Sequence, residues 1–143
     1  VMLAGTILGA RNGALSMILF LVVVALGANL LAGGRGGLGV FAGPTAGFLF
    51  AFPFSAFAAG LLTRSLSAKF SLTIAAGIGA FVGGILVMYL FGIAGFKLMT
   101  GRTWLESLMI MWVYIPGDAV KVVLAALVTG AVARALPGTF ANQ

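Results

Sequence analysis

The sequence has 143 residues, of which 62% are hydrophobic and 7% are charged, with eight Lys and Arg against two acidic residues. A soluble domain carries about 25% charged residues, so this composition excludes a water-soluble fold and predicts an integral membrane protein. The lack of Cys and His excludes disulfides, thiol catalysis and histidine-based metal sites or proton relays. Because Glu106 and Asp118 are the only carboxylates, we expect no metal and no cofactor. The cations are scattered singly, which argues against nucleic-acid binding.

The first apolar block, residues 1–10, is too short to span a bilayer, which takes about 20 apolar residues. It ends at Arg11-Asn12-Gly13, and it lacks the charged region and cleavage site of a signal peptide. Two interpretations stay open: a short surface helix or, as we prefer, a helix whose beginning lies outside the chain. The next block, 14–32, is rich in Leu and Val and predicts a full span.

The rest of the chain predicts three further spans, at residues 44–62, 71–96 and 115–135. A glycine-rich loop at 33–39 precedes the first of them, and a turn at 63–70 separates the first two. A short segment, 104–114, carries aromatic residues typical of the membrane interface and leads into the last helix. The predicted fold class is therefore an all-α membrane protein, a compact transmembrane helix bundle. It has about four full spans and one partial span in a single domain, residues 1–143.

The cations at the ends of these spans predict the orientation in the membrane, because cytoplasmic loops carry an excess of Lys and Arg. One side of the membrane receives Arg11, Arg64, Lys69 and Arg134. The other side receives Arg35, Lys97 and Arg102. This difference favours a cytoplasmic C-terminal tail and an external Arg35 loop.

Small residues recur four apart along the predicted spans, a spacing that lets helices approach closely in lipid. The three stripes are Gly47, Ala51, Ser55 and Ala59; Ala75, Gly79 and Gly83; and Ala126 and Gly130. We expect them to pack within the bundle, and the alternative is a face kept for a partner membrane protein.

The glycine-rich loop is the first polar site in this apolar background. Its five glycines surround Arg35 and could form a flexible connector. However, the loop runs on into Pro44, which suits the first turn of a helix, and Thr45 brings a hydroxyl to that turn. Backbone amides at a helix N-terminus attract anions, and Arg35 could complete a carboxylate or phosphate site. The loop lacks the Lys-Ser/Thr ending of a nucleotide-binding P-loop.

The second polar site is Asp118 with Lys121, three residues apart at the start of the last predicted helix and hence on one face. Asp118 could cap this helix, with Lys121 pairing with it or extending to the interface. Charges inside a membrane segment are costly, however, and commonly mark a ligand or ion path. Together the two side chains suit a small ligand with amide-like donors and acceptors.

These stretches resemble the BioY family, the biotin-specific S components of energy-coupling factor (ECF) transporters. The resemblance lies in GGRGGLGVF at 33–41, in GPTAGFL at 43–49, and in Pro116-Gly117-Asp118 with Lys121, which matches a Pro-Gly-Asp-x-x-Lys signature. Residues 8–16 resemble the tight turn between the second and third helices of the family. Asn29-Leu30-Leu31 departs from the Pro-Val-Phe run common in the family, and Ala46 replaces a glycine.

The resemblance implies a six-helix protein of the bacterial or archaeal cell membrane that binds biotin and lacks the family's first helix here. Its implied partners are biotin, a membrane scaffold subunit, two ATPase subunits and the lipid bilayer. It further implies that Asp118 and Lys121 engage the ureido ring and that Arg35 is a candidate for the carboxylate. The other candidate binding residues are Thr45, Phe41, Gly43 and Tyr114. The chain is then a substrate-binding subunit, not an enzyme.

Two other functions stay open at this point. The chain could be an S component for another vitamin, such as thiamine or riboflavin. It could also be a structural or assembly membrane protein in which Asp118 only caps a helix.

Overall fold

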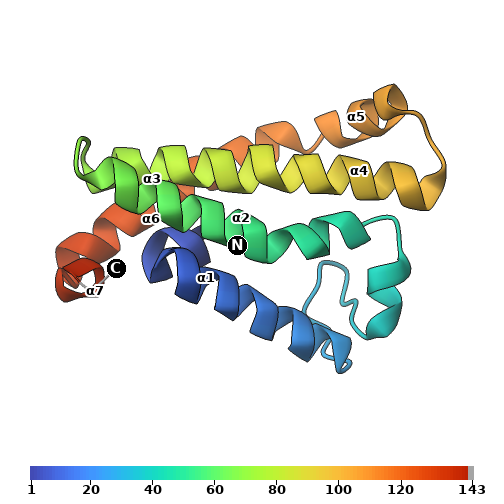
Figure 1. Ribbon diagram of the computed structural model, residues 1–143, viewed down its shortest axis with the longest axis horizontal. Coiled ribbons are helices and arrows are strands. Elements are labelled where there is room, and N and C mark those ends of the chain that lie inside the picture. The colour runs from blue at the N-terminus through green and yellow to red at the C-terminus, as the bar shows by residue number, and fades with distance from the viewer. Residues whose placement is uncertain (142–143) are drawn as a thin grey trace.

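The structure is a computed structural model that describes residues 1–141, and these residues form a helical bundle (Figure 1). The elements in chain order are α1 (Met2–Ala25), the 3₁₀ helix η1 (Leu38–Ala42), α2 (Ala46–Ser67), α3 (Leu72–Phe81), the π-helical η2 (Val82–Val87), α4 (Met88–Thr100), α5 (Trp104–Trp112), α6 (Ile115–Ala135) and α7 (Gly138–Ala141). The predicted all-α fold class is confirmed.

Helix α1 reverses direction near its beginning. Gly9 has φ 82° and ψ 175°, a conformation outside the helical region that glycine adopts without steric cost. The two arms then lie against each other, since a Cβ on Gly13 would be 2.9 Å from the Cα of Gly5. Helix α2 packs into this turn, where a Cβ on Gly60 would be 2.7 Å from the carbonyl oxygen of Gly5. The predicted tight turn within residues 8–16 is therefore present.

The boundaries of the predicted spans need correction. The span expected at 14–32 ends at Ala25, because the chain turns at Gly27 with φ 111°. The span expected at 44–62 begins at Ala46 and runs to Ser67, so Pro44 lies in the turn before the helix. The span expected at 71–96 runs to Thr100 and contains the π-helical segment η2.

Within residues 1–141, four helical segments are long and apolar enough to cross a membrane. They are Met2–Ala25, Ala46–Ser67, Leu72–Thr100 and Ile115–Ala135. The number agrees with the predicted number of full spans. The first segment includes the reversal at Gly9, so its longer arm alone is shorter than a typical span.

The small-residue stripes pack inside the bundle, as expected. A Cβ on Gly47 of α2 would be 2.8 Å from the Cα of Gly95 of α4, and one on Gly83 would be 2.8 Å from the Cβ of Ala59. The hydroxyl of Ser55 donates to the carbonyl oxygen of Gly83 in the π segment. Among the described residues, no buried side-chain nitrogen or oxygen lacks a hydrogen-bond partner, as a bilayer requires.

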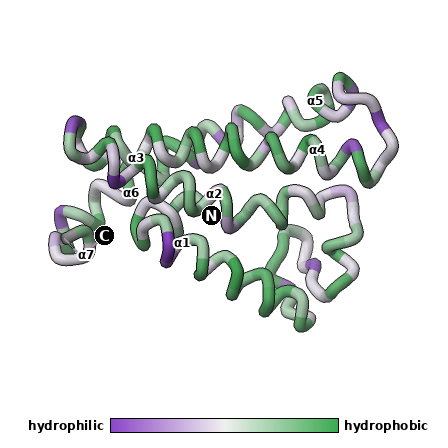
Figure 2. Tube along the Cα trace, viewed as in Figure 1, coloured by the Kyte–Doolittle hydropathy of each residue, from purple (hydrophilic) through white to green (hydrophobic). Residues whose placement is uncertain are grey.

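Hydrophilic residues gather near the two ends of the bundle, with hydrophobic residues along the helices between them (Figure 2). The α1 turn, the α2–α3 loop and the C-terminal end of α6 lie at one end of Figure 1, and η1 and the α4–α5 loop lie at the other. The two sets of cations that were predicted to lie on opposite sides of the membrane therefore belong to opposite ends of the bundle.

Candidate functional site

The first part of the site is the beginning of α6. Pro116 occupies the first turn of this helix, where its missing N–H costs no hydrogen bond. The backbone N–H of Asp118 donates to the carbonyl oxygen of Tyr114 at 3.0 Å, which fixes Asp118 in the first turn. The side chain of Asp118 does not bond the helix amides, so the alternative interpretation in which it caps α6 is wrong.

The carboxylate of Asp118 is instead held by two side chains. Tyr89 of α4 donates its phenolic hydrogen to Oδ2 at 2.5 Å. Nζ of Lys121 donates to Oδ1 at 2.6 Å, so of the two alternatives for Lys121, pairing with Asp118 is the one present. The Lys121 side chain is 68% exposed and that of Asp118 is 17% exposed. Asp118 is thus a fixed acceptor, while Lys121 reaches it from an open side.

Tyr89 owes its position to the surrounding packing. It is 7% exposed and forms a buried cluster with Ile85 and Met111. The ring of Phe48 on α2 meets it edge to face, with centroids 5.9 Å apart and an interplanar angle of 87°. Because Tyr89 lies eleven residues before Thr100, it sits roughly 16 Å from the end of α4. The Asp118 carboxylate therefore lies well inside the bundle and not at its rim.

The second part of the site is the glycine-rich loop. The chain turns back at Gly33 and Gly34, which both have positive φ, and Leu31 pairs with Arg35 as an isolated antiparallel bridge. The N–H of Gly37 donates to the carbonyl oxygen of Val24 at 2.7 Å, which ties the loop to the end of α1. The glycines are therefore required by the backbone conformation of a folded loop.

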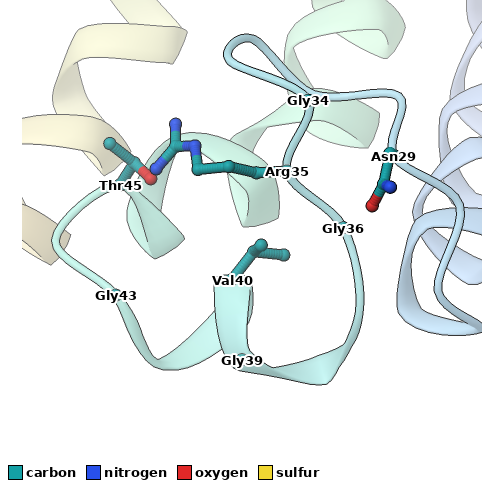
Figure 3. A pocket seen from close by; sticks show the side chains of 8 residues that line it. All are labelled: Asn29, Gly34, Arg35, Gly36, Gly39, Val40, Gly43 and Thr45. Carbon is teal, nitrogen blue, oxygen red and sulfur yellow. The ribbon is translucent and has the colours of Figure 1, made fainter.

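This loop borders an open hollow of about 360 Å³ beside the N-terminal end of α2 (Figure 3). Its walls are Asn29, Gly34, Arg35, Gly36, Gly39, Val40, Gly43 and Thr45. The guanidinium of Arg35 extends toward the side chain of Thr45 in this view. Nε of Arg35 donates to the carbonyl oxygen of Ala32 at 3.1 Å, which ties the guanidinium to the loop backbone.

The electrostatics of the hollow favour an anion. Thr45 is the N-cap residue of α2, and its hydroxyl makes no capping hydrogen bond to that helix. The positive end of the α2 dipole and the charge of Arg35 therefore act on the same space. A carboxylate in the hollow would meet both.

The structure brings the predicted residues together in two groups. Arg35, Gly43 and Thr45 line the hollow, and Asp118 and Lys121 form the ion pair with Tyr114 one turn earlier. The first turn of α2 links the groups, since Thr45 faces the hollow and Phe48 contacts Tyr89. Phe41 does not line the hollow and packs on Phe50 instead, with centroids 5.9 Å apart.

Sequence reasoning missed two residues of this region, Tyr89 and Asn29. Tyr89 lies in an otherwise apolar span, and its polar hydroxyl was the one available signal. Asn29 lies where the sequence departs from the common family pattern. This residue lines the hollow, so the departure was the available signal.

Glu106, the other carboxylate, has a local structural role. It forms a capping box with Thr103 at the beginning of α5, in which each side chain binds the backbone N–H of the other residue. The hydrogen bond from the Thr103 backbone N–H and that from its hydroxyl lower the pKa of Glu106. Glu106 is exposed and therefore does not compete with Asp118 as a ligand-binding acid.

Comparison with known proteins decides the family. The model of the BioY family matches residues 1–138. This chain belongs to the BioY family. The biotin transporter BioY of Rhodobacter capsulatus is 46% identical over 147 aligned residues, which cover 96% of this chain and 76% of that protein. The biotin transporter BioY of Rhizobium etli is 41% identical and covers 96% of this chain and 75% of that protein.

A solved structure shows the same arrangement of helices as this BioY family member. It is a crystal structure of the S-component for biotin from an ECF-type ABC transporter. The two share 28% sequence identity and a TM-score of 0.86, over 93% of this chain and 71% of the other. The family and four apolar helices establish a multi-pass membrane protein.

Proposed function

We propose that this protein is the membrane-embedded biotin-binding subunit of an ECF transporter and that it mediates biotin uptake. It has no enzymatic role in this proposal, and it works in the cell membrane with a scaffold subunit and two ATPase subunits. Its relatives named as biotin transporters and its structural similarity to a biotin S-component support the proposal. The end of the bundle with Arg11, Arg64, Lys69 and Arg134 faces the cytoplasm, following the positive-inside rule.

The observation that carries the proposal is the Asp118 carboxylate held between Tyr89 and Lys121. Biotin has a ureido ring with two N–H donors and one carbonyl acceptor. Asp118 accepts from a ureido N–H, and Lys121 turns from Asp118 to donate to the ureido carbonyl oxygen. Lys121 is free to turn because most of its side chain is exposed.

The opposite end of biotin is a carboxylate on a flexible chain. Arg35 and the N-terminal end of α2 receive it in the hollow, with Thr45 as a further donor and Gly43 shaping the wall. Tyr114 lies close in sequence to the ureido end, and Phe41 supports the loop by packing on Phe50. Pockets of this kind are largely apolar with a few placed polar groups.

The test compares the two carboxylates of the chain. Biotin is titrated calorimetrically into the purified wild-type protein and into the Asp118→Asn and Glu106→Gln variants. We expect sub-micromolar binding by the wild type and a roughly ten- to hundred-fold loss for Asp118→Asn, because a hydrogen bond to a charged group is lost. Glu106→Gln keeps the capping geometry and should bind as the wild type does.

Either of two results with the ligand would reject the proposal, and a third result would remove Asp118 from the site. If the wild type does not bind biotin below micromolar concentration, the protein is not a biotin carrier. If thiamine or riboflavin displaces biotin, the ligand is another vitamin. An Asp118→Asn variant that loses thermal stability but keeps its biotin affinity would assign Asp118 to the α4–α6 contact alone.

A further inference from the structure

A second hollow lies beside the α1 turn. Figure 1 shows this turn at the opposite end of the bundle from η1 and the glycine-rich loop. It has a volume of about 530 Å³. Its polar wall consists of Arg11, Asn12 and Arg64, and its apolar wall includes Leu8, Phe57 and Leu61. The reversal of α1 at Gly9 creates the space, because it brings the first residues of the longer arm beside the last turns of α2.

Within residues 1–141, neither Arg11 nor Arg64 of this hollow forms an ion pair. The sequence contains two acidic residues, Glu106 and Asp118. Glu106 bonds Thr103, and Asp118 bonds Tyr89 and Lys121. Two guanidinium groups on the polar wall of one hollow repel each other, so an anion bound between them stabilises both.

The surface next to the hollow gives the anion its chemical class. Phe50, Phe54, Phe57, Leu61 and Arg64 of α2 follow one another at spacings of four, three, four and three residues. This spacing places all five on one face of the helix, and the four apolar side chains are exposed. An apolar stripe about three turns long thus ends at a cation, which is complementary to an acyl chain followed by an anionic headgroup.

We propose that this hollow binds an anionic phospholipid. Arg11 and Arg64 hold the phosphate, and Asn12 adds a hydrogen-bond donor. One acyl chain lies along Phe57 and Phe54. The planar guanidinium suits a phosphate because it donates two parallel hydrogen bonds to it. The site does not depend on biotin and lies at the end of the bundle away from the proposed vitamin pocket.

The test measures lipid selectivity of the purified protein. Phosphatidylglycerol and phosphatidylcholine are titrated separately into protein in a neutral detergent, and native mass spectrometry counts the lipids retained. We expect the wild type to retain phosphatidylglycerol preferentially. The double variant Arg11→Gln, Arg64→Gln should weaken this binding by about five-fold per arginine, or roughly twenty-five-fold in all.

The matched control removes the same charge at the same end of the bundle. Lys69 and Arg134 lie outside the hollow. The double variant Lys69→Gln, Arg134→Gln should therefore keep the preference for phosphatidylglycerol. An equal loss in both double variants would overturn the proposal, because it would show attraction to bulk charge only. If the arginine double variant does not fold, as judged by circular dichroism, the single variant Arg64→Gln with its five-fold loss decides.

Two further outcomes identify another occupant and overturn the lipid assignment. Competition by sn-glycerol 3-phosphate or inorganic phosphate at the same concentration as the lipid would show a site for the free anion that makes no use of the apolar stripe. A wild type without any preference for phosphatidylglycerol would leave an acidic segment of a partner protein as the occupant.

Discussion

The phenol of Tyr89 donates a hydrogen bond of 2.5 Å to Oδ2 of Asp118 and so joins α4 to the first turn of α6. The bond fixes the plane of the carboxylate, because Tyr89 is itself held by Ile85, Met111 and the ring of Phe48. The second oxygen, Oδ1, is left to face the exposed Lys121. Tyr89 is therefore a positioning residue for the acceptor of the proposed ureido site.

Replacing Tyr89 with Phe tests this role. We expect a roughly ten-fold loss of biotin affinity, since Asp118 loses one strong donor and its fixed orientation. The loss should be the same for biotin and for its methyl ester, which differ only at the distant carboxylate. In an Asp118→Ala background the Tyr89→Phe change should have no further effect on affinity, as a double-mutant cycle by calorimetry would show.

Thr129→Val is the matched control for loss of a hydroxyl between helices. Thr6 and Thr129 share a buried hydrogen bond of 2.8 Å between α1 and α6, away from the proposed site. This variant should lower the free energy of unfolding by about 1 kcal/mol and leave the biotin affinity unchanged. Equal losses of affinity in both variants would mean that Tyr89 acts through general stability.

Arg35→Gln tests the carboxylate end of the pocket. In the wild type we expect biotin methyl ester to bind roughly ten-fold more weakly than biotin, because the ester cannot form the charged contact. In Arg35→Gln this difference should shrink to nearly nothing. Arg102 is a loop cation outside the hollow. The variant Arg102→Gln should keep the full difference in affinity between biotin and its methyl ester. A full difference in Arg35→Gln would place the carboxylate elsewhere.

Gly79 and Gly77 form a matched pair within α3. A Cβ on Gly79 would lie 2.5 Å from Oγ1 of Thr63, whereas one on Gly77 would meet the Cβ of Ala126 at 3.4 Å, an ordinary contact. Gly79→Ala should therefore destabilise the bundle by about 1–3 kcal/mol, and Gly77→Ala should be neutral or slightly stabilising. Thermal unfolding in detergent measures both. Unchanged stability of Gly79→Ala would contradict the close approach of α3 to α2, and a similar loss at Gly77 would show that the effect is not specific to this contact.

The capping box of α5 predicts a pH effect on Trp104. Since the pKa of Glu106 is lowered in the folded protein, its contribution to the first turn is present above the unfolded pKa and disappears as the pH falls through the folded pKa. In a Trp112→Phe background, Trp104 is the remaining tryptophan, and Lys97 lies 5.0 Å from its ring centroid. Its fluorescence should change with a midpoint below the ordinary pKa of glutamate. Adding Glu106→Gln should abolish the transition.

Hydropathy and turn residues were sufficient to predict the helical class and most spans of this chain. They failed at residues 26–32, where Leu26, Leu30 and Leu31 continue the apolar run although the helix has ended. An apolar loop and an apolar helix have the same hydropathy in a membrane protein. The end of α1 is set by the positive φ of Gly27 and by the bond from Gly37 to Val24, which depend on the folded loop.

The sequence identified only some residues of the candidate site, because contacts between helices cannot be read from one segment. Asp118, Lys121 and Arg35 stood out because charges are rare in this chain, and the ion pair followed from their spacing along one helix. Tyr89 could not be found in this way, since its partner is 29 residues away. The contact depends on how α4 packs against α6, and spacing along a single helix contains no such information.

The ion pair between Asp118 and Lys121 has a consequence for discrimination among ligands. A ligand that enters the proposed site must first separate these charges. It recovers the free energy of the lost ion pair only if it offers both a donor for Asp118 and an acceptor for Lys121. A molecule with one of the two leaves an unpaired charge in an apolar bundle, which is a larger penalty than a missing contact. In the proposed site, we therefore expect the closed pair to reject molecules that match only half of it.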